Sequence, residues 1–207
     1  MNIAAISTGP YMEMCYLVWG PEQKALVFDP GFDAAMIFQS LEEHGVEVAA
    51  YVLTHTHYDH INALADLYEK CPAPIIVHSK DWAWAFDDRN NGAPYYPVPR
   101  KPETEDIQWL ETSKDWKIAD LHFQVLETPG HTPGGCCLHF PESEILICGD
   151  TLFKGSCGRT DLPGGDPRQL KDSLKRLKQL PDETRIFPGH GEGSTIGDEK
   201  ATNFFMQ

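Results

Sequence analysis

The sequence predicts an α+β fold in which mixed β-sheets are covered by helices. Short apolar runs typical of strands recur along the whole chain. Only some neighbouring runs are separated by a helix-like segment, so the strict β–α–β alternation of a doubly wound parallel sheet is missing. No polar or low-complexity tract divides the 207 residues. We therefore expect one domain, residues 1–207, that buries a single substantial core.

The apolar runs and the helical spacings set the expected elements in order. Strands are expected at residues 14–19, 25–28, 48–53, 75–77, 121–126, 136–140, 145–148 and 185–187. Helices are expected at residues 34–44, which stop at Gly45, and at residues 168–180, which stop at Pro181. Shorter helices are expected at residues 61–68 and 80–86. Residues 89–102 contain an Asn-Gly pair and four prolines, so they predict an ordered surface loop.

Composition excludes several classes of protein. The formal net charge is -14 and the basic residues are interleaved with acidic ones, so nucleic acid is not an expected partner. The six cysteines have no Cys-x-x-Cys spacing, which argues against a zinc ribbon and favours reduced thiols. No run approaches the ~20 apolar residues of a membrane span, and the N-terminus lacks the pattern of a signal peptide. We expect a cytoplasmic protein without a membrane partner, and the oligomeric state stays open.

The strongest motif for chemistry is Thr-His-Thr-His-Tyr-Asp-His at residues 54–60, directly after an apolar strand. Side chains two apart on an extended segment share a face, so His55 and His57 can reach one metal ion. A turn into a helix near Asp59 then directs Asp59 and His60 toward a second point. A packing role does not account for three imidazoles and a carboxylate within six positions at a strand end.

Three further candidates follow other strands at Gly-containing turns. His131 and His190 each end a Pro-Gly-His turn, and Asp150 follows Gly149 after the strand 145–148. Strand ends bring loops together over a rigid scaffold. Imidazole nitrogens and carboxylate oxygens are ligands that zinc, iron and manganese accept, and a set without thiolates is typical of a catalytic site. The alternative is a binding module in which the metals only stabilise the fold.

The ordered motifs at residues 54–60, 128–134, 149–153 and 188–191 resemble those of the metallo-β-lactamase superfamily over nearly the whole chain. The resemblance implies an αββα sandwich, with two mixed sheets face to face, helices outside and metals at one edge. It implies a first metal position at His55, His57 and His131 and a second at Asp59, His60 and His190, with Asp150 as the bridge. Asp29 matches a position that supports a ligand through a hydrogen bond, the alternative being a turn-forming aspartate.

Within the superfamily the chain resembles the short glyoxalase II-like enzymes, which hydrolyse hydroxyacylglutathione thioesters. The resemblance rests on residues 149–161 and 188–195 and on the short tail after them. It implies two divalent transition-metal ions, Zn²⁺ first and Fe or Mn as alternatives, whose bridging hydroxide attacks a small-molecule thioester such as S-lactoylglutathione. Asp59, His131 and Asp150 are the candidate catalytic residues, as ligands of these ions. The longer glyoxalase II enzymes carry a C-terminal helical extension that binds glutathione, and this chain has no matching segment.

Two questions stay open from the sequence. Persulfide dioxygenases share the scaffold and resemble residues 157–161, but use one iron at the positions of His55, His131 and Asp150. An acidic chain that binds an acidic thioester also needs local positive charge, which Lys154 and Arg159 could supply. The alternative for Arg159 is a bracing ion pair with Asp161. The aromatic loop with Tyr95 and Tyr96 is a candidate to close over the acyl group, or an ordinary surface loop.

Overall fold

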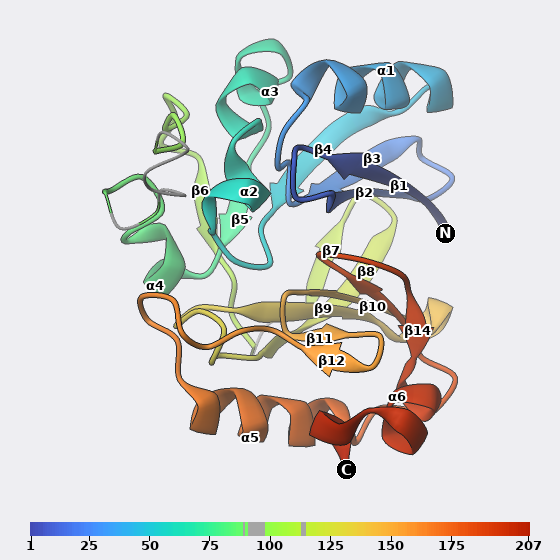
Figure 1. Cartoon of the computed structure of the whole chain (residues 1–207). Helices are drawn as coiled ribbons and strands as arrows, with labels where there is room; N and C mark the ends of the chain where they lie inside the picture. The colour runs from blue at the N-terminus through green and yellow to red at the C-terminus, as the bar shows by residue number, and fades with distance from the viewer. Residues whose placement is uncertain (89, 91–97, 113–114) are drawn as a thin grey trace.

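The computed structural model describes residues 1–88, 90, 98–112 and 115–207. Two mixed sheets pack face to face, with helices on both outer faces, so the predicted αββα sandwich is confirmed (Figure 1). The first sheet is ordered β1 (Asn2–Thr8), β2 (Glu13–Trp19), β3 (Lys24–Phe28), β4 (Glu47–Val52), β5 (Ile75–Val77) and β6 (Ile107–Trp109). It is antiparallel from β1 to β3 and parallel from β3 to β6.

The second sheet is ordered β14 (Ser194–Thr195), β13 (Arg185–Pro188), β10 (Ile145–Gly149), β9 (Cys136–Phe140), β8 (Leu121–Glu127) and β7 (Trp116–Ile118). Within this sheet β10 and β13 pair in parallel, and the other neighbouring strands pair antiparallel. A separate hairpin joins β11 (Leu152–Phe153) to β12 (Ser156–Cys157). The helices are α1 (Ala34–His44), α2 (Tyr58–Ile61), α3 (Leu64–Lys70), α4 (Ser79–Trp82), α5 (Pro167–Leu177) and α6 (Ile196–Thr202), with short 3₁₀ turns η1 (Pro141–Ser143) and η2 (Phe204–Met206).

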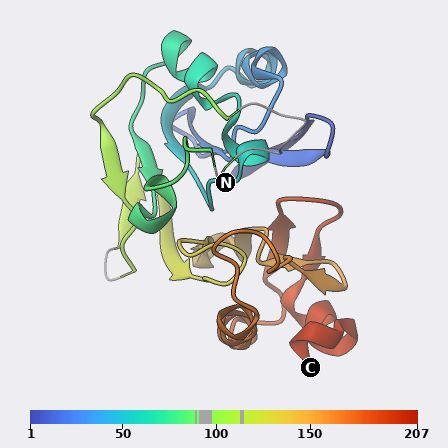
Figure 2. The same cartoon turned by 60° about the vertical axis from the view of Figure 1, so that its left-hand side comes forward.

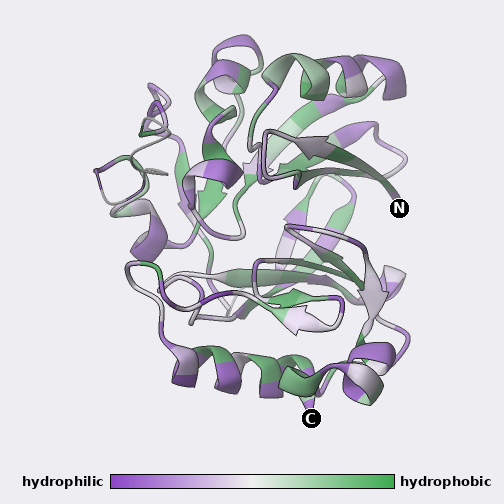
Figure 3. Ribbon diagram, viewed as in Figure 1, coloured by the Kyte–Doolittle hydropathy of each residue, from purple (hydrophilic) through white to green (hydrophobic). Residues whose placement is uncertain are grey.

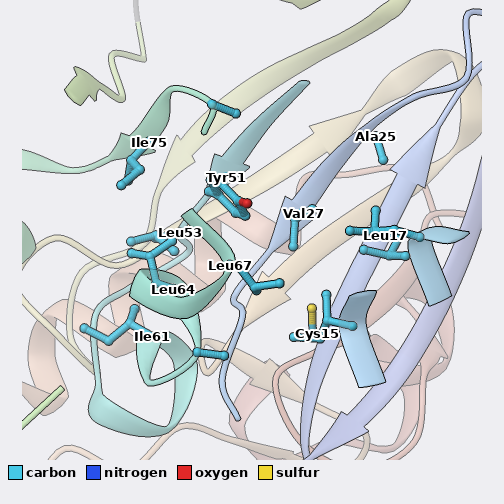
Figure 4. Close-up of a cluster of buried hydrophobic side chains, with 14 of the residues drawn as sticks. Cys15, Leu17, Ala25, Val27, Tyr51, Leu53, Ile61, Leu64, Leu67 and Ile75 are labelled. Atoms are coloured by element: carbon cyan, nitrogen blue, oxygen red, sulfur yellow. The ribbon is translucent and has the colours of Figure 1, made fainter. Parts of the chain in front are cut away.

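Strand β2 explains how the layers are held together. Successive side chains of a strand point to opposite faces, so Cys15 and Leu17 pack under α1 and α3 (Figure 4), while Tyr16 and Val18 pack between the two sheets. All four are buried. Because both faces are covered, this strand is apolar on both faces, and each buried aliphatic side chain contributes about 1.5–3 kcal/mol.

Helix α5 covers the outer face of the second sheet, opposite the side that carries α1 and α3 (Figure 2). Its N-terminus is capped by Asp166, whose carboxylate accepts from the backbone N–H groups of Arg168 and Gln169, and Pro167 occupies the first helical turn. Leu170 and Leu174 pack on the sheet while the outward face is polar (Figure 3).

The structure corrects several expected boundaries. The helix at 34–44 and the strands at 75–77 and 136–140 match. The other expected strands differ by one residue at one end, except that expected at 48–53, which is shifted by one residue at both ends. The helix expected at 61–68 is instead α2 and α3, because the chain turns between them at residues 62–63. The helix expected at 80–86 stops at Trp82, and that expected at 168–180 ends at Leu177. Strands β1, β6, β7, β11, β12 and β14 and helix α6 were not predicted, since most are short or have mixed polarity.

Residues 98–102 form no helix or strand. The positions expected to form the aromatic part of that loop, Tyr95 and Tyr96, lie outside the described residues. None of the helices in the described part of the chain has the length and apolar content that a membrane span requires.

Candidate metal centre

Four chain segments meet at one edge of the sandwich, each just beyond the end of a strand. His55 and His57 follow β4, and α2 then carries Asp59 and His60. The other three side chains follow β8, β10 and β13, at His131, Asp150 and His190. Backbone hydrogen bonds fasten the segments together, from Cys136 to Thr54 across the two sheets and from Gly189 to Gly149 within the second. The structure therefore brings together all seven side chains that the sequence singled out.

The first cluster consists of His55, His57 and His131. One ligand atom from each lies within 4.8 Å of the others, and all three side chains are buried. Nδ1 of His57 lies 2.8 Å from Nε2 of His131. On its far side, Nδ1 of His131 lies 2.7 Å from the carbonyl oxygen of Arg159, which fixes this ring nitrogen as the N–H donor and leaves Nε2 free for a metal.

The second cluster consists of Asp59, His60 and His190. Their ligand atoms also lie within 4.8 Å of one another. Nε2 of His190 lies 3.5 Å from Oδ2 of Asp59, and its Nδ1 lies 3.1 Å from the carbonyl oxygen of Tyr11, so the ring is held from behind by the β1–β2 hairpin.

Asp150 lies between the two clusters. Its Oδ2 is 3.4 Å from Nε2 of His131 and 3.6 Å from Nε2 of His190, while its Oδ1 is 3.5 Å from Nε2 of His60. One carboxylate thus faces imidazoles of both clusters. A ligand that bridges two metal ions, one in each cluster, would have to lie in this position.

The donor atoms that face the centre fit a bound metal. Nε2 of His55, Nε2 of His60 and Oδ1 of Asp150 are buried and have no hydrogen-bond partner among the described residues. A buried polar atom without a partner costs about 1–3 kcal/mol. Nitrogen and carboxylate donors without a thiolate suit zinc, iron or manganese, so the side chains present fit two divalent ions.

Burial and mutual repulsion keep the first cluster in its metal-binding form. Burial, and then the neighbouring His131, lower the pKa of His57 to about 3. The pKa of His55 is lowered well below its ordinary value, again chiefly by burial and then by His60. Burial alone would raise the pKa of Asp150, but the imidazoles around it hold that pKa well below its ordinary value. Neutral imidazoles and an ionised carboxylate are the species that bind a metal.

Asp29 supports the second cluster from beneath. Its Oδ1 accepts from the backbone N–H of Thr54 at 2.7 Å, and its Oδ2 accepts from the Thr54 hydroxyl at 2.5 Å. The same Oδ2 lies 3.1 Å from Nδ1 of His60. A carboxylate oxygen of Asp29 also lies within 4.8 Å of a ring nitrogen of His55 and of His60. Both oxygens of Asp29 already have hydrogen-bond partners, however. The geometry therefore agrees with the supporting role expected from the sequence.

Glycines let the ligand segments approach one another. A Cβ atom at Gly189 would collide with Oδ1 of Asp150, and one at Gly149, whose φ is +45°, would collide with the side chain of Thr54. Only glycine fits both turns without displacing Asp150 or Thr54. The Gly-Asp and Pro-Gly-His motifs are thus requirements of close packing around the centre.

Sequence reasoning missed two buried carboxylates beside the centre. Oε1 of Glu13 lies 3.6 Å from Nδ1 of His60, while its other oxygen accepts from the Thr8 hydroxyl. Asp81 accepts from Thr132 and Gly134, in the turn that follows His131. Both side chains are fully buried. Glu13 is the one acidic residue at the start of the apolar strand β2, whereas Asp81 lies in the mostly polar helix α4 and gives no signal in the sequence.

Lys154 and Arg159 lie on the surface, each paired with a carboxylate. The ammonium of Lys154 is 2.6 Å from Oε2 of Glu192. The guanidinium of Arg159 donates to both oxygens of Asp161, at 2.6 and 2.8 Å, as the alternative interpretation of this residue expected. Arg159 also lines a surface cavity of about 610 Å³ between β12, α5 and η2. A role of either cation in substrate binding stays a prediction.

Comparison with known proteins agrees with this geometry. The model of the family described as "Metallo-beta-lactamase superfamily" matches residues 8–190. Among curated proteins, the chain is 35% identical to "Probable metallo-hydrolase YqgX" of Bacillus subtilis, over 100% of this chain and 98% of that protein. It is 32% identical to "Hydroxyacylglutathione hydrolase GloC" of Haemophilus influenzae, again over 100% and 98%.

Solved structures show the same relationship. BLEG-1, described as a B3 metallo-beta-lactamase, superposes with a TM-score of 0.92 at 31% identity and 99% coverage of both chains. TTHA1623 in a di-iron-bound form gives 0.86 at 38% identity, over 98% of this chain and 99% of that one. ETHE1 from Myxococcus xanthus gives 0.80 at 28% identity, over 99% and 84%.

Proposed function

The chain belongs to the metallo-beta-lactamase superfamily, a superfamily of metal-dependent hydrolases, and we propose on that premise that it cleaves thioesters of the hydroxyacylglutathione type with two metal ions. The observation that carries the proposal is the position of Asp150 between two complete clusters, one of three histidines and one of Asp59, His60 and His190. A single iron at His55, His131 and Asp150 would leave Asp59 and His190 without a metal to bind. The likeness to GloC, whose name states a hydroxyacylglutathione hydrolase, supports the choice of thioester.

Two divalent ions held by the two clusters would supply a hydroxide nucleophile at neutral pH and would polarise a substrate carbonyl. The side chains of the chain itself hold this arrangement in place. The carbonyl of Arg159 orients the His131 ring, the carbonyl of Tyr11 orients the His190 ring, and Asp29 orients His60. Because these partners are fixed before substrate arrives, little reorganisation is needed as negative charge develops on the carbonyl oxygen.

The alternative function, persulfide dioxygenase activity with one iron, uses only His55, His131 and Asp150. It is favoured by the structural likeness to ETHE1. It is also favoured by the short distance of Asp150 from His131, which belongs with His55 to the first cluster. The two functions differ in their need for His190. Hydrolysis by two metals requires it, whereas a single iron at the three other ligands does not.

The test compares metal-loaded wild-type protein with His190→Ala on two substrates. Wild-type protein should release thiol from S-lactoylglutathione at the same rate with and without oxygen, and His190→Ala should lose at least about 100-fold in kcat/KM. His122→Ala is the matched control, since this histidine lies on β8 beside Asp115, outside both clusters. Rapid oxygen uptake with glutathione persulfide, no thioester hydrolysis and an unaffected His190→Ala variant would assign the dioxygenase instead. Benzylpenicillin is assayed in parallel because of the likeness to BLEG-1.

A further inference from the structure

Asp81 in helix α4 joins the two segments that supply the first metal cluster. Its Oδ2 accepts from the hydroxyl of Thr132 at 2.7 Å, and its Oδ1 accepts from the backbone N–H of Gly134 at 2.6 Å. Thr132 is the neighbour of His131 in the chain. The carboxylate therefore holds the turn that follows this ligand.

The backbone of the same residue holds the other segment. The carbonyl oxygen of Asp81 accepts from the hydroxyl of Thr56 at 3.0 Å, and Thr56 stands between His55 and His57. Asn90 fastens Thr56 from its other side, because its amide donates to the Thr56 carbonyl at 2.5 Å. Segment 54–57 continues the first sheet, while segment 128–134 continues the second. A single residue thus connects ligand segments from both sheets.

The turn after His131 is shaped around this carboxylate. A Cβ atom at Gly134 would lie only 2.8 Å from Oδ1 of Asp81, so a larger residue could not bring its N–H to the carboxylate. The side chains of Asp81, Thr56 and Thr132 are all fully buried. A buried carboxylate costs several kcal/mol unless its oxygens are hydrogen-bonded, and here both are. An apolar side chain would give stability at less cost but could not accept these two hydrogen bonds.

We propose that Asp81 is a positioning residue that fixes His57 relative to His131 and so sets the affinity of the first metal position. The rings of His57 and His131 face each other with 2.8 Å between Nδ1 and Nε2, and each belongs to a segment that Asp81 holds. The proposal rests on the metal centre of the proposed function and is independent of the substrate that the centre cleaves.

The test isolates the first position by using His190→Ala as the background, which removes a ligand of the second. Zn²⁺ affinity is measured by competition with a chromophoric chelator, without substrate. Adding Asp81→Ala should weaken Zn²⁺ binding about 10–100-fold, the usual loss when a group that orients a metal ligand is removed. Asp81→Asn should recover most of the affinity, because its Oδ1 can still accept from Gly134 and its Nδ2 can donate to the Thr132 hydroxyl.

A second pair of variants covers the case in which Asp81→Ala does not fold. Thr132→Val keeps the side-chain shape but removes the donor to Asp81, so it should weaken Zn²⁺ binding, whereas Thr132→Ser keeps the donor and should not. The control is Glu199→Gln, since Glu199 is a buried carboxylate that accepts from Gly155 and Ser194 away from the first cluster.

Glu199→Gln should lower the thermal midpoint without lowering Zn²⁺ affinity. Unchanged affinity in Asp81→Ala and Thr132→Val would overturn the proposal. So would an equal loss of affinity in Glu199→Gln, because that loss would reflect general destabilisation. A protein that binds Zn²⁺ as described but leaves thioesters intact would refute the proposed function alone.

Discussion

Oδ2 of Asp29 lies 3.1 Å from Nδ1 of His60, so the carboxylate holds this imidazole by the nitrogen that faces away from Asp150. The hydrogen bond fixes the ring so that Nε2 points into the centre. Asp29 itself has a φ of +44°, a left-handed conformation that aspartate and asparagine adopt more readily than most residues. Its place in the Asp-Pro-Gly turn therefore serves both the turn and the ligand.

Replacing Asp29 should weaken metal binding at the second cluster more than at the first. Asp29→Ala removes the partner of His60, and we expect the Zn²⁺ dissociation constant of the second cluster to rise about 10–100-fold in chelator competition. Asp33→Ala is the matched control, because Asp33 also has a positive φ, of 52°, and its carboxylate accepts a hydrogen bond from the backbone N–H of Gly9. Equal Zn²⁺ binding by the two variants would show that Asp29 acts only in the turn.

The ion pair of Arg159 with Asp161 gives a prediction about substrate recognition. If the guanidinium binds a substrate carboxylate, Arg159→Ala should raise KM for S-lactoylglutathione, and Asp161→Asn should lower it by freeing the fork-shaped cation. KM for an uncharged thioester should stay the same in both variants. Metal content should also be unchanged, since His131 contacts the backbone carbonyl of Arg159 and not its side chain. KM changes of equal size on the charged and the uncharged thioester would assign the pair to loop structure.

The pKa of Asp81 predicts how stability depends on pH. Burial raises this pKa from 3.8 to about 6, against the lowering effect of hydrogen bonds from Thr132 and Gly134. The folded protein therefore binds the proton more tightly than the unfolded chain does. The stabilising contribution of the protonated group is full below about pH 4 and is lost as the pH rises through about 6.

Urea unfolding of metal-free protein tests this dependence against Asp81→Asn, which cannot titrate. Between pH 4 and pH 7 the free energy of unfolding of the wild type should fall relative to the variant by on the order of 2–3 kcal/mol. A difference between the two proteins that stays constant over this range would contradict the raised pKa.

Mixed sheets covered by helices could be predicted because strands such as β2 and β9 are buried on both faces and read as largely apolar runs, whereas the αββα layering was implied by the resemblance of the motifs. Strand β1 mixes exposed, half-buried and buried side chains and was not predicted, although it pairs along its whole length with β2. Its place depends on a partner strand that the local pattern does not reveal. Likewise, one helix was expected at residues 61–68, but α2 ends at Ile61 and α3 begins at Leu64, since the backbone N–H of Ala63 donates to the carbonyls of Pro30 and Gly31 in the Asp-Pro-Gly turn.

The site could be predicted further than the fold because its ligands follow strand ends at fixed motifs. His55, His57, Asp59 and His60 lie within one short segment, and the remaining ligands each follow a glycine. Glu13 and Asp81 could not be found in the same way. Their proximity to the centre arises from packing between segments far apart in the chain. A lone acidic residue in a sequence does not indicate which of those segments its side chain contacts.

The measurement that tests the two-metal centre most directly is a Zn²⁺ titration of metal-free protein, with S-lactoylglutathione hydrolysis followed at each step. Because Asp150 lies between both clusters, activity should stay low through the first equivalent and rise with the second, saturating at close to two ions per chain. Asp150→Ala should bind both ions more weakly and remain inactive. Full activity at one ion per chain, unchanged when the second is added, would contradict a centre in which both clusters act together.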